Sequence, residues 1–145
     1  MPRALDPRAL RRVMNVWPPF LFSGVHVHRI AEDWRSAEVH LRSRGGNLFS
    51  MTDPFWMLLT MNALGGGYIV WDRAGEIEFL KPGKGRVVAR FALDDATLDE
   101  IRAATAGGEK HLRWMQTEVV DAGGEVVARV RKQLYIRRKR DRDRQ

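Results

Sequence analysis

The sequence predicts one α+β domain in which a strongly curved antiparallel sheet wraps around a single long helix. The helix is predicted from residues 48–64, a stretch so apolar that a helix formed by it must be covered on every side. The sheet is predicted from extended segments that lie before and after this stretch and alternate apolar with polar residues. A chain of 145 residues has the usual size of one domain.

The N-terminal part predicts a helix followed by a hairpin. Residues 8–22 begin with apolar residues at helical spacing, and Pro18 and Pro19 end this helix because proline cannot continue the hydrogen-bond ladder. Residues 25–30 and 34–41 then alternate apolar and polar side chains, which predicts two strands joined by a tight turn.

The part after the central helix predicts the rest of the sheet. A run of glycines at 65–67 ends the helix, since glycine tolerates the left-handed conformation of a C-cap. Turn-forming residues then separate four further strands. These strands are predicted at residues 68–80, 86–93, 110–120 and 125–136, with a short helix at 94–106. We expect strand 68–80 to pair with its own copy across a two-fold axis, so that a homodimer, or a tetramer built from it, is the working form.

The net charge of +7 is concentrated near the C-terminus. Residues 129–144 carry nine Lys and Arg against two Asp, which accounts for the whole surplus. A folded nucleic-acid reader more often spreads basic side chains over one face, with aromatic residues between them. We therefore interpret residues 137–145 as a solvated, disordered tail. Docking of this tail to nucleic acid or an anionic membrane is the less favoured alternative.

Composition excludes several classes of protein. An apolar fraction of 44% with 30% charged residues is a globular balance, and the chain has no cysteine for disulfides or thiolate metal sites. No apolar stretch reaches membrane-spanning length and no secretory signal is visible, so we expect a cytoplasmic protein without a membrane span. His26 and His28 share one strand face, but no third ligand follows at zinc spacing, so we expect no metal.

The segment 44–55 carries the candidate chemistry. Gly45 and Gly46 form a turn that feeds the apolar helix, and such a turn can present backbone N–H groups to an anionic oxygen. The N–H of Gly46, with Asn47, supplies these donors in this interpretation, and Asp53 holds or deprotonates water. A structural alternative stays open, because Asp-Pro also begins helices, with Asp53 as N-cap and Pro54 at the first helical position.

The run from Gly45 to Asp53 resembles the glycine-glycine turn and central helix of hotdog-fold thioesterases, especially those of the phenylacetate-pathway type. Residues 76–83, Glu-Ile-Glu-Phe-Leu-Lys-Pro-Gly, resemble the strand of that clade that ends in Phe-Leu-Arg-Pro. The resemblance covers residues 24–136, and leaves 1–23 as an N-terminal helical segment and 137–145 as the tail. The chain also resembles an uncharacterised branch of that superfamily, whose members are named thioesterases mainly by their fold.

The resemblance implies a hotdog fold and hydrolysis of an acyl thioester of coenzyme A or of an acyl-carrier protein. It implies Asp53 as base or nucleophile, Gly46 as oxyanion donor, no cofactor, and sites formed between two subunits. Arg44 stands where the clade usually has histidine, and Pro54 follows the catalytic acid. The residues that we expect to contact substrate are Arg44, Gly45, Phe55, Trp56 and Met57, with Lys81 and Arg86 as contacts for phosphate.

Two further hypotheses compete with hydrolysis. The chain can be a non-catalytic hotdog module that binds acyl groups or thioesters without turnover, for which Arg44 and Pro54 are the best support. It can also be a basic-tailed protein that docks to nucleic acid or to a membrane, a reading that we rank third.

Overall fold

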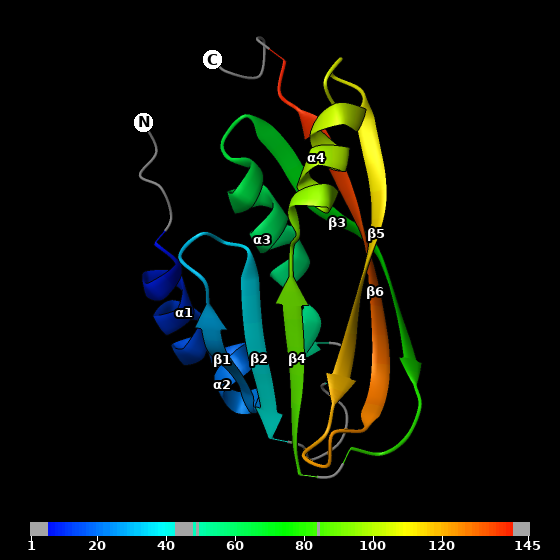
Figure 1. Ribbon diagram of the computed structural model, residues 1–145. Helices are drawn as coiled ribbons and strands as arrows, with labels where there is room; N and C mark the ends of the chain where they lie inside the picture. Colours follow the sequence, from blue (N-terminus) through cyan, green and yellow to red (C-terminus); the bar gives the residue numbers. More distant parts are fainter. Residues whose placement is uncertain (1–5, 43–47, 49, 84, 141–145) are drawn as a thin grey trace.

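The computed structural model describes residues 6–42, 48, 50–83 and 85–140. One sheet and one enclosed helix dominate it, and two N-terminal helices lie beside the first strand (Figure 1). In chain order the elements are α1 (Pro7–Val16), α2 (Pro18–Ser23), β1 (Val25–Ile30), β2 (Ser36–Arg42), the 3-10 turn η1 (Ser50–Thr52), α3 (Phe55–Leu64), β3 (Tyr68–Phe79), β4 (Arg86–Ala92), α4 (Asp95–Ala104), β5 (Lys110–Val120) and β6 (Val126–Arg138).

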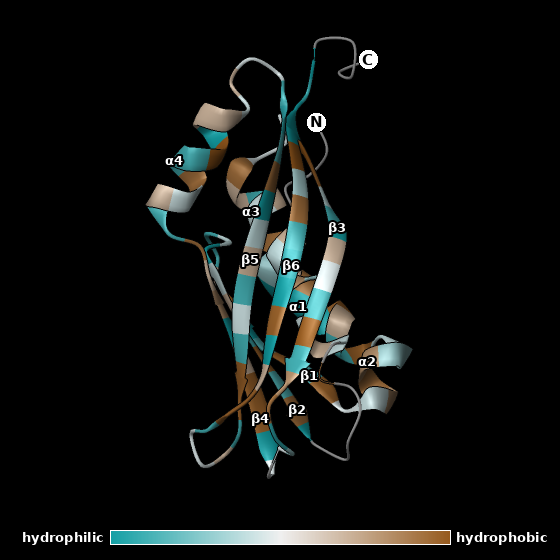
Figure 2. Cartoon of the chain, turned by 90° about the vertical axis from the view of Figure 1, so that its right-hand side faces the viewer, coloured by the Kyte–Doolittle hydropathy of each residue, from teal (hydrophilic) through white to brown (hydrophobic). Residues whose placement is uncertain are grey.

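The sheet confirms the predicted α+β architecture. Its six strands run in the order β1-β2-β4-β5-β6-β3, and every neighbouring pair is antiparallel. Alternate residues point to the enclosed helix, so that Val87, Ala89 and Phe91 of β4 are at most 1% exposed. Figure 2 shows the resulting alternation of hydrophobic and hydrophilic residues along the strands. The inner face of the sheet and one side of α3 therefore form the core.

The predicted single helix over residues 48–64 is wrong at its start. The structure has the short turn η1, then Asp53 and Pro54, and α3 begins only at Phe55. Pro54 has no N–H for a helical hydrogen bond, and its ring disfavours the helical conformation of the residue before it. The prediction that this helix is buried on every side is also not met within one chain. Phe55 and Leu59 are buried, whereas the opposite side of α3 is only partly covered.

The N-terminal segment also differs from the prediction. The first helix, α1, ends at Val16, just before Pro18, as predicted. A second helix, α2, which was not predicted, begins at Pro18, because proline is well suited to the first position of a helix. Met14 of α1 and Phe20 of α2 belong to the same core as the sheet, so this segment packs as part of the domain. Asn15 covers the outer edge of β1, since its side chain accepts from the N–H of Val27 and donates to the Val27 carbonyl.

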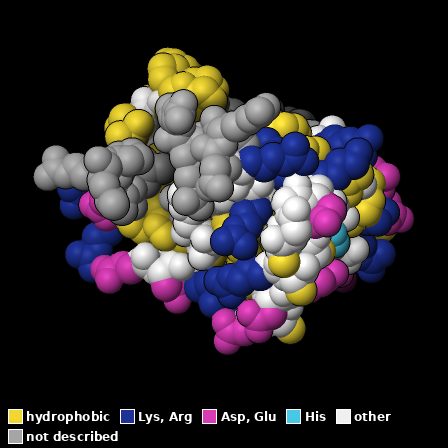
Figure 3. Space-filling view, turned by 90° about the horizontal axis from the view of Figure 1, so that it is seen from above, with side chains coloured by type: hydrophobic (Ala, Val, Ile, Leu, Met, Phe, Trp, Pro, Cys, Tyr) yellow, Lys and Arg dark blue, Asp and Glu magenta, His cyan; other side chains and the backbone are white. Residues whose placement is uncertain are grey.

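The basic C-terminal region is largely part of the sheet. Strand β6 runs to Arg138, two residues past the predicted end of the domain. Arg129 forms ion pairs with acids on β3 and β5, and Arg131 pairs with Glu76. The remaining positive charge gathers at the end of the molecule where β6 finishes, with Arg138 and Arg140 exposed (Figure 3). Among the described helices, none is long and apolar enough to cross a membrane.

Candidate functional site

Asp53, Asp72 and Lys132 form a charged cluster on the inner side of the sheet, next to the start of α3. The Lys132 Nζ lies 2.7 Å from Asp53 Oδ1. The lysine side chain is 7% exposed, whereas that of Asp53 is 53% exposed. A buried ammonium group thus holds a carboxylate that solvent, or a substrate, can reach.

Lys132 is buried because of its place on β6. The neighbouring residues on the inward-facing side of this strand, Val130 and Leu134, are at most 1% exposed. Strand geometry puts every second residue on the same face, so Lys132 must point into the core with them. A buried ammonium group is costly unless it is paired, and the ion pair with Asp53 supplies the partner.

Asp72 enters the cluster from β3, where it follows the buried Val70 by two positions. Its Oδ1 is buried and has no hydrogen-bond partner among the described residues. Burial raises the pKa of Asp72 above its ordinary value, and the charge and hydrogen bonding of Asp53 act in the same direction, while Lys132 opposes them. Two adjacent carboxyl groups resist simultaneous ionisation. Asp72 is therefore the member of the pair that keeps a proton to higher pH than usual.

Asp53 is not the N-cap of α3, so the structure does not have the alternative role that the sequence left open for it. The N-cap of α3 is Pro54, whose carbonyl accepts from the N–H of Leu58 at 3.0 Å, and no side chain caps this helix. The Asp53 carboxylate instead faces Lys132. A half-exposed carboxylate can accept a proton from water or attack an electrophilic carbonyl carbon.

The predicted glycine turn cannot be placed against this cluster. Arg44, Gly45, Gly46 and Asn47 lie outside the described residues. Their expected roles as oxyanion donors and substrate contacts stay predictions. The nearest described positions are Leu48 and the turn η1, whose Ser50 carbonyl accepts from the N–H of Asp53.

The aromatic residues expected to contact an acyl group lie in or beside the core. Phe55 is 1% exposed and packs against Phe91, with ring centroids 5.3 Å apart. Trp56 is 5% exposed, and its Nε1 donates to Thr117 Oγ1 at 2.7 Å. Met57 is partly buried on the less covered side of α3. Of the three, Met57 has the position best suited to meet a ligand.

The two basic residues expected to contact phosphate lie elsewhere. Lys81 follows β3 and forms an ion pair with Glu125. Arg86 begins β4 and lines a pocket on the outer face of the sheet, the opposite face from α3. Neither residue makes a recorded contact with the Asp53 cluster within the described part of the chain.

Sequence reasoning missed Asp72 and Lys132, although a signal for both exists. Each is a charged residue at an inward position of a strand whose other inward residues are apolar, two places from Val70 and Val130 respectively. A charge in such a position must find a partner.

No group of three or more His, Asp or Glu residues that could hold a metal ion occurs within the described ranges.

Comparison with known proteins relates the whole domain to one family and one fold. Residues 8–136 match the family model described as "Domain of unknown function (DUF4442)". No curated protein matches. A Pseudomonas aeruginosa protein of unknown function, named a probable thioesterase, has a TM-score of 0.80 at 16% identity, over 93% of this chain and 97% of the other.

Two further solved structures agree in fold. A thioesterase from Haemophilus influenzae has a TM-score of 0.63 at 13% identity and covers 92% of each chain. The Escherichia coli PaaI protein, from the phenylacetic acid degradation operon, has a TM-score of 0.56 at 16% identity and also covers 92% of each chain. At identities this low, the structural similarity shows a shared fold alone. It confirms the expected hotdog architecture. The chain belongs to the family described as Domain of unknown function DUF4442, and its fold is the hotdog fold of these thioesterases.

Proposed function

We propose that this protein hydrolyses an acyl thioester of coenzyme A or of an acyl-carrier protein. The observation that carries the proposal is the half-exposed carboxylate of Asp53, which lies just before the enclosed helix of a hotdog fold and is held by the buried Lys132. The names of the structural neighbours, which include thioesterases, support the same reaction class.

Asp53 acts as base or nucleophile in this proposal. As a base, it takes a proton from water while the water oxygen attacks the carbonyl carbon; as a nucleophile, its oxygen forms that bond, and water then releases the acyl group. In both routes the C–S bond breaks and the thiolate leaves with a proton from solvent. The N–H of Gly46, with Asn47, stabilises the negative charge that grows on the carbonyl oxygen.

Lys132 is a positioning residue for Asp53. Its ammonium group donates a hydrogen bond to Asp53 Oδ1 at 2.7 Å and holds that side chain in one orientation. Asp72 completes the cluster as a neighbouring carboxyl group that favours its protonated form. The buried Lys132 and the half-buried Asp72 thus lie against the solvent-facing Asp53 and fix its position.

Substrate contacts follow from the same placement. The acyl group lies along the less covered side of α3, where Met57 is available, and Gly45, Phe55 and Trp56 stay candidates beside it. Methionine adapts to acyl groups of different shape. Arg44 and Lys81 stay candidates for contact with the phosphates of the carrier, whereas Arg86 lies on the opposite face of the sheet from Asp53.

A homodimer, possibly assembled further into a tetramer, is the proposed working form. In the described part of the chain, strand β3 is bonded to β6 on one side only, and its other side is an edge of the sheet. The opposite free edge, on β1, is covered by Asn15, whereas Trp71 and Phe79 of β3 are 46% and 63% exposed. A long uncovered edge strand with exposed apolar side chains favours pairing with another copy.

The test is steady-state hydrolysis of short, long and aromatic acyl-coenzyme A thioesters by the wild type and by Asp53→Asn. Loss of a catalytic base lowers the rate by roughly 10²–10⁴. Asp99→Asn is the matched control, because Asp99 is an exposed carboxylate on α4 that pairs with Arg102. Equal rates for the wild type and Asp53→Asn on every substrate that is turned over would exclude the assigned role.

A non-catalytic module that binds acyl groups is the second candidate. It is favoured by the ion pair itself, since Lys132 already occupies one oxygen of the Asp53 carboxylate. The same substrate panel separates the two: binding of a thioester without turnover by the wild type supports the module and contradicts hydrolysis.

A further inference from the structure

A basic pocket lies on the outer face of the sheet, away from the Asp53 cluster. It has a volume of about 330 Å³ and is formed where β1, β2 and β4 lie side by side. None of the described residues that line it is acidic. The lining residues are Gly24, His26, His28, His40, Arg42 and Arg86.

The sheet register brings these basic side chains together. His26 of β1 lies opposite His40 of β2, and Arg42 of β2 lies opposite Arg86 of β4. The rings of His28 and His40 are stacked, with centroids 4.7 Å apart and planes within 7° of parallel. Directly opposite residues on adjacent strands project from the same face, so four cationic or titratable groups converge on one small area.

The local field at this pocket is positive. The pKa of His26 lies below its ordinary value, first because of burial and then because of the positive charges of His40 and Arg11. The nearest acid, Glu38, is already engaged: its two carboxylate oxygens contact His40, at 2.6 Å, and Arg90. Glu38 thus offsets part of the charge at His40, but the basic groups that line the pocket outnumber this one acid, and an excess of like charge attracts an anion.

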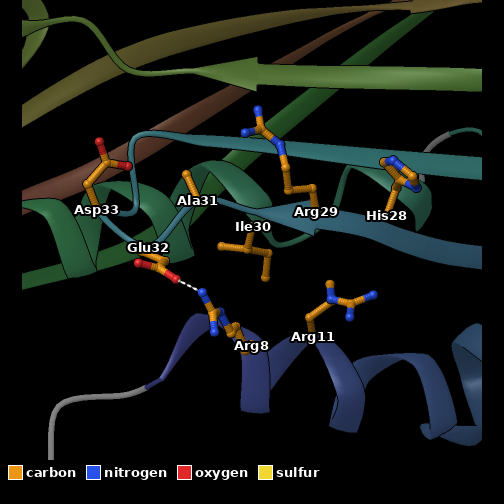
Figure 4. A pocket seen from close by; sticks show the side chains of 8 residues that line it. All are labelled: Arg8, Arg11, His28, Arg29, Ile30, Ala31, Glu32 and Asp33. Atoms are coloured by element: carbon orange, nitrogen blue, oxygen red, sulfur yellow. Dashed lines mark hydrogen bonds and ion pairs between the residues drawn. The ribbon is translucent and has the colours of Figure 1, made fainter.

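A second pocket, of about 690 Å³, adjoins the first and shares His28 with it. Arg8 and Arg11 of α1 line one side, and His28 and Arg29 of β1 line the other (Figure 4). Arg8 forms an ion pair with Glu32, and a second acid, Asp33, also lines this pocket, so its three arginines exceed its two acids by one charge. The basic surface therefore continues past His28 toward α1.

We propose that the pocket between His26, His40, Arg42 and Arg86 binds a phosphate group. Arginine presents planar, paired donors that match phosphate oxygens, and protonated imidazole adds further donors. Its volume lies in the lower part of the range of small-ligand sites, roughly 300–1,000 Å³. The phosphate can be inorganic phosphate or the phosphate of an ester whose organic part extends past His28. The site does not depend on hydrolysis at Asp53.

Binding depends on pH through the histidines. A histidine that is neutral in the free protein gains a proton when an anion binds beside it, so affinity rises as pH falls from about 8 to about 6. Sulfate is the probe for this dependence, because it keeps its double charge over this range whereas phosphate does not. The groups that face His26 are Arg11 of α1, His28 of β1, His40 and Arg42 of β2 with Glu38 behind His40, and Arg86 of β4.

The test is calorimetric titration of the full chain with inorganic phosphate, AMP and adenosine, and with sulfate at about pH 6 and about pH 8. The variant is Arg42→Gln combined with Arg86→Gln, and Arg12→Gln is the control, because Arg12 is exposed on α1 and lines neither pocket. We expect the double variant to bind phosphate at least about tenfold more weakly, because it loses the two charged guanidinium groups of the pocket.

The outcomes separate the possible sources of the phosphate. Tighter binding of AMP than of phosphate, with none of adenosine, identifies a phosphate ester, and equal binding identifies the phosphate group alone. Absence of saturable binding by the wild type, or an equal loss in Arg12→Gln, would overturn the site. A second variant, His28→Asn, keeps both arginines and should therefore still bind phosphate. Its affinity for sulfate should change less between the two pH values than the affinity of the wild type does. Hydrolase activity, present or absent, leaves these outcomes unchanged.

Discussion

The unequal exposure of the two partners predicts that the Asp53–Lys132 ion pair responds very differently to removal of either side. Lys132 is 7% exposed and Asp53 is 53% exposed. Asp53→Ala leaves a buried ammonium group without its direct partner. Lys132→Met instead leaves a carboxylate that water can solvate, and places an apolar side chain beside Val130 and Leu134, which are buried.

The size of the effect follows from the geometry. Breaking a fully buried ion pair by removing one partner costs about 3–5 kcal/mol. Half of the Asp53 side chain is solvated, which weakens the pair, and the nearby Asp72 carboxyl group gives Lys132 a second polar neighbour. We therefore expect Asp53→Ala to lower the free energy of unfolding by about 2 kcal/mol, or Tm by about 4–8 °C. Lys132→Met should change it by less than about 1 kcal/mol.

The assay is urea unfolding followed by tryptophan fluorescence, for both single variants and the double variant, at one protomer concentration. The double variant has neither charge of the ion pair, so its stability should return to within about 1 kcal/mol of the wild type. A Lys132→Met variant that loses as much stability as Asp53→Ala, or strictly additive effects in the double variant, would refute the reasoning.

Three other predictions follow from single contacts. Burial raises the pKa of Asp72, so its contribution to stability is complete below its unfolded pKa, near 3.8, and is lost as pH rises through the folded pKa. Asp72→Asn should therefore become progressively more stable relative to the wild type between about pH 4 and pH 7, as measured by Tm; parallel curves would contradict this. Trp56→Phe removes the buried donor to Thr117 and should cost about 1–3 kcal/mol in urea unfolding, and an unchanged midpoint would show that the bond contributes nothing. Asn15→Ala removes both hydrogen bonds to Val27 and should cost about 2 kcal/mol, with faster amide exchange along β1; unchanged exchange there would argue against the edge-covering role.

The pattern of alternation along the chain was enough to predict most of the sheet. The predicted strand 110–120 is β5, Lys110–Val120, and the predicted strand 25–30 is β1, Val25–Ile30. Alternation is a local property, because successive side chains of a strand point to opposite faces whatever the strand pairs with. The errors arose beside prolines, because α2, which begins at Pro18, was not predicted and α3 begins only after Pro54. Proline acts on the backbone conformation and does not interrupt an apolar pattern.

The candidate site was only partly predictable, for the same reason. Asp53 was found because the run from Gly45 to Asp53 resembles the glycine-glycine turn and central helix of hotdog-fold thioesterases. Lys132 was counted with the basic residues of the C-terminal region. Its side chain points into the core because β6 pairs with β3 and β5. The hydrogen bond to Asp53 spans 79 positions along the chain.

The amino-acid order thus determined an α+β domain, its strands, its enclosed helix and one candidate acid, because each depends on neighbours in the chain. Tertiary structure alone decided which charges meet. Lys132 and Asp72 reach Asp53, and Arg42 lies opposite Arg86, only through the register of paired strands. Coulomb and hydrogen-bond energies depend on separation in space, and strand pairing sets that separation between residues far apart in the sequence.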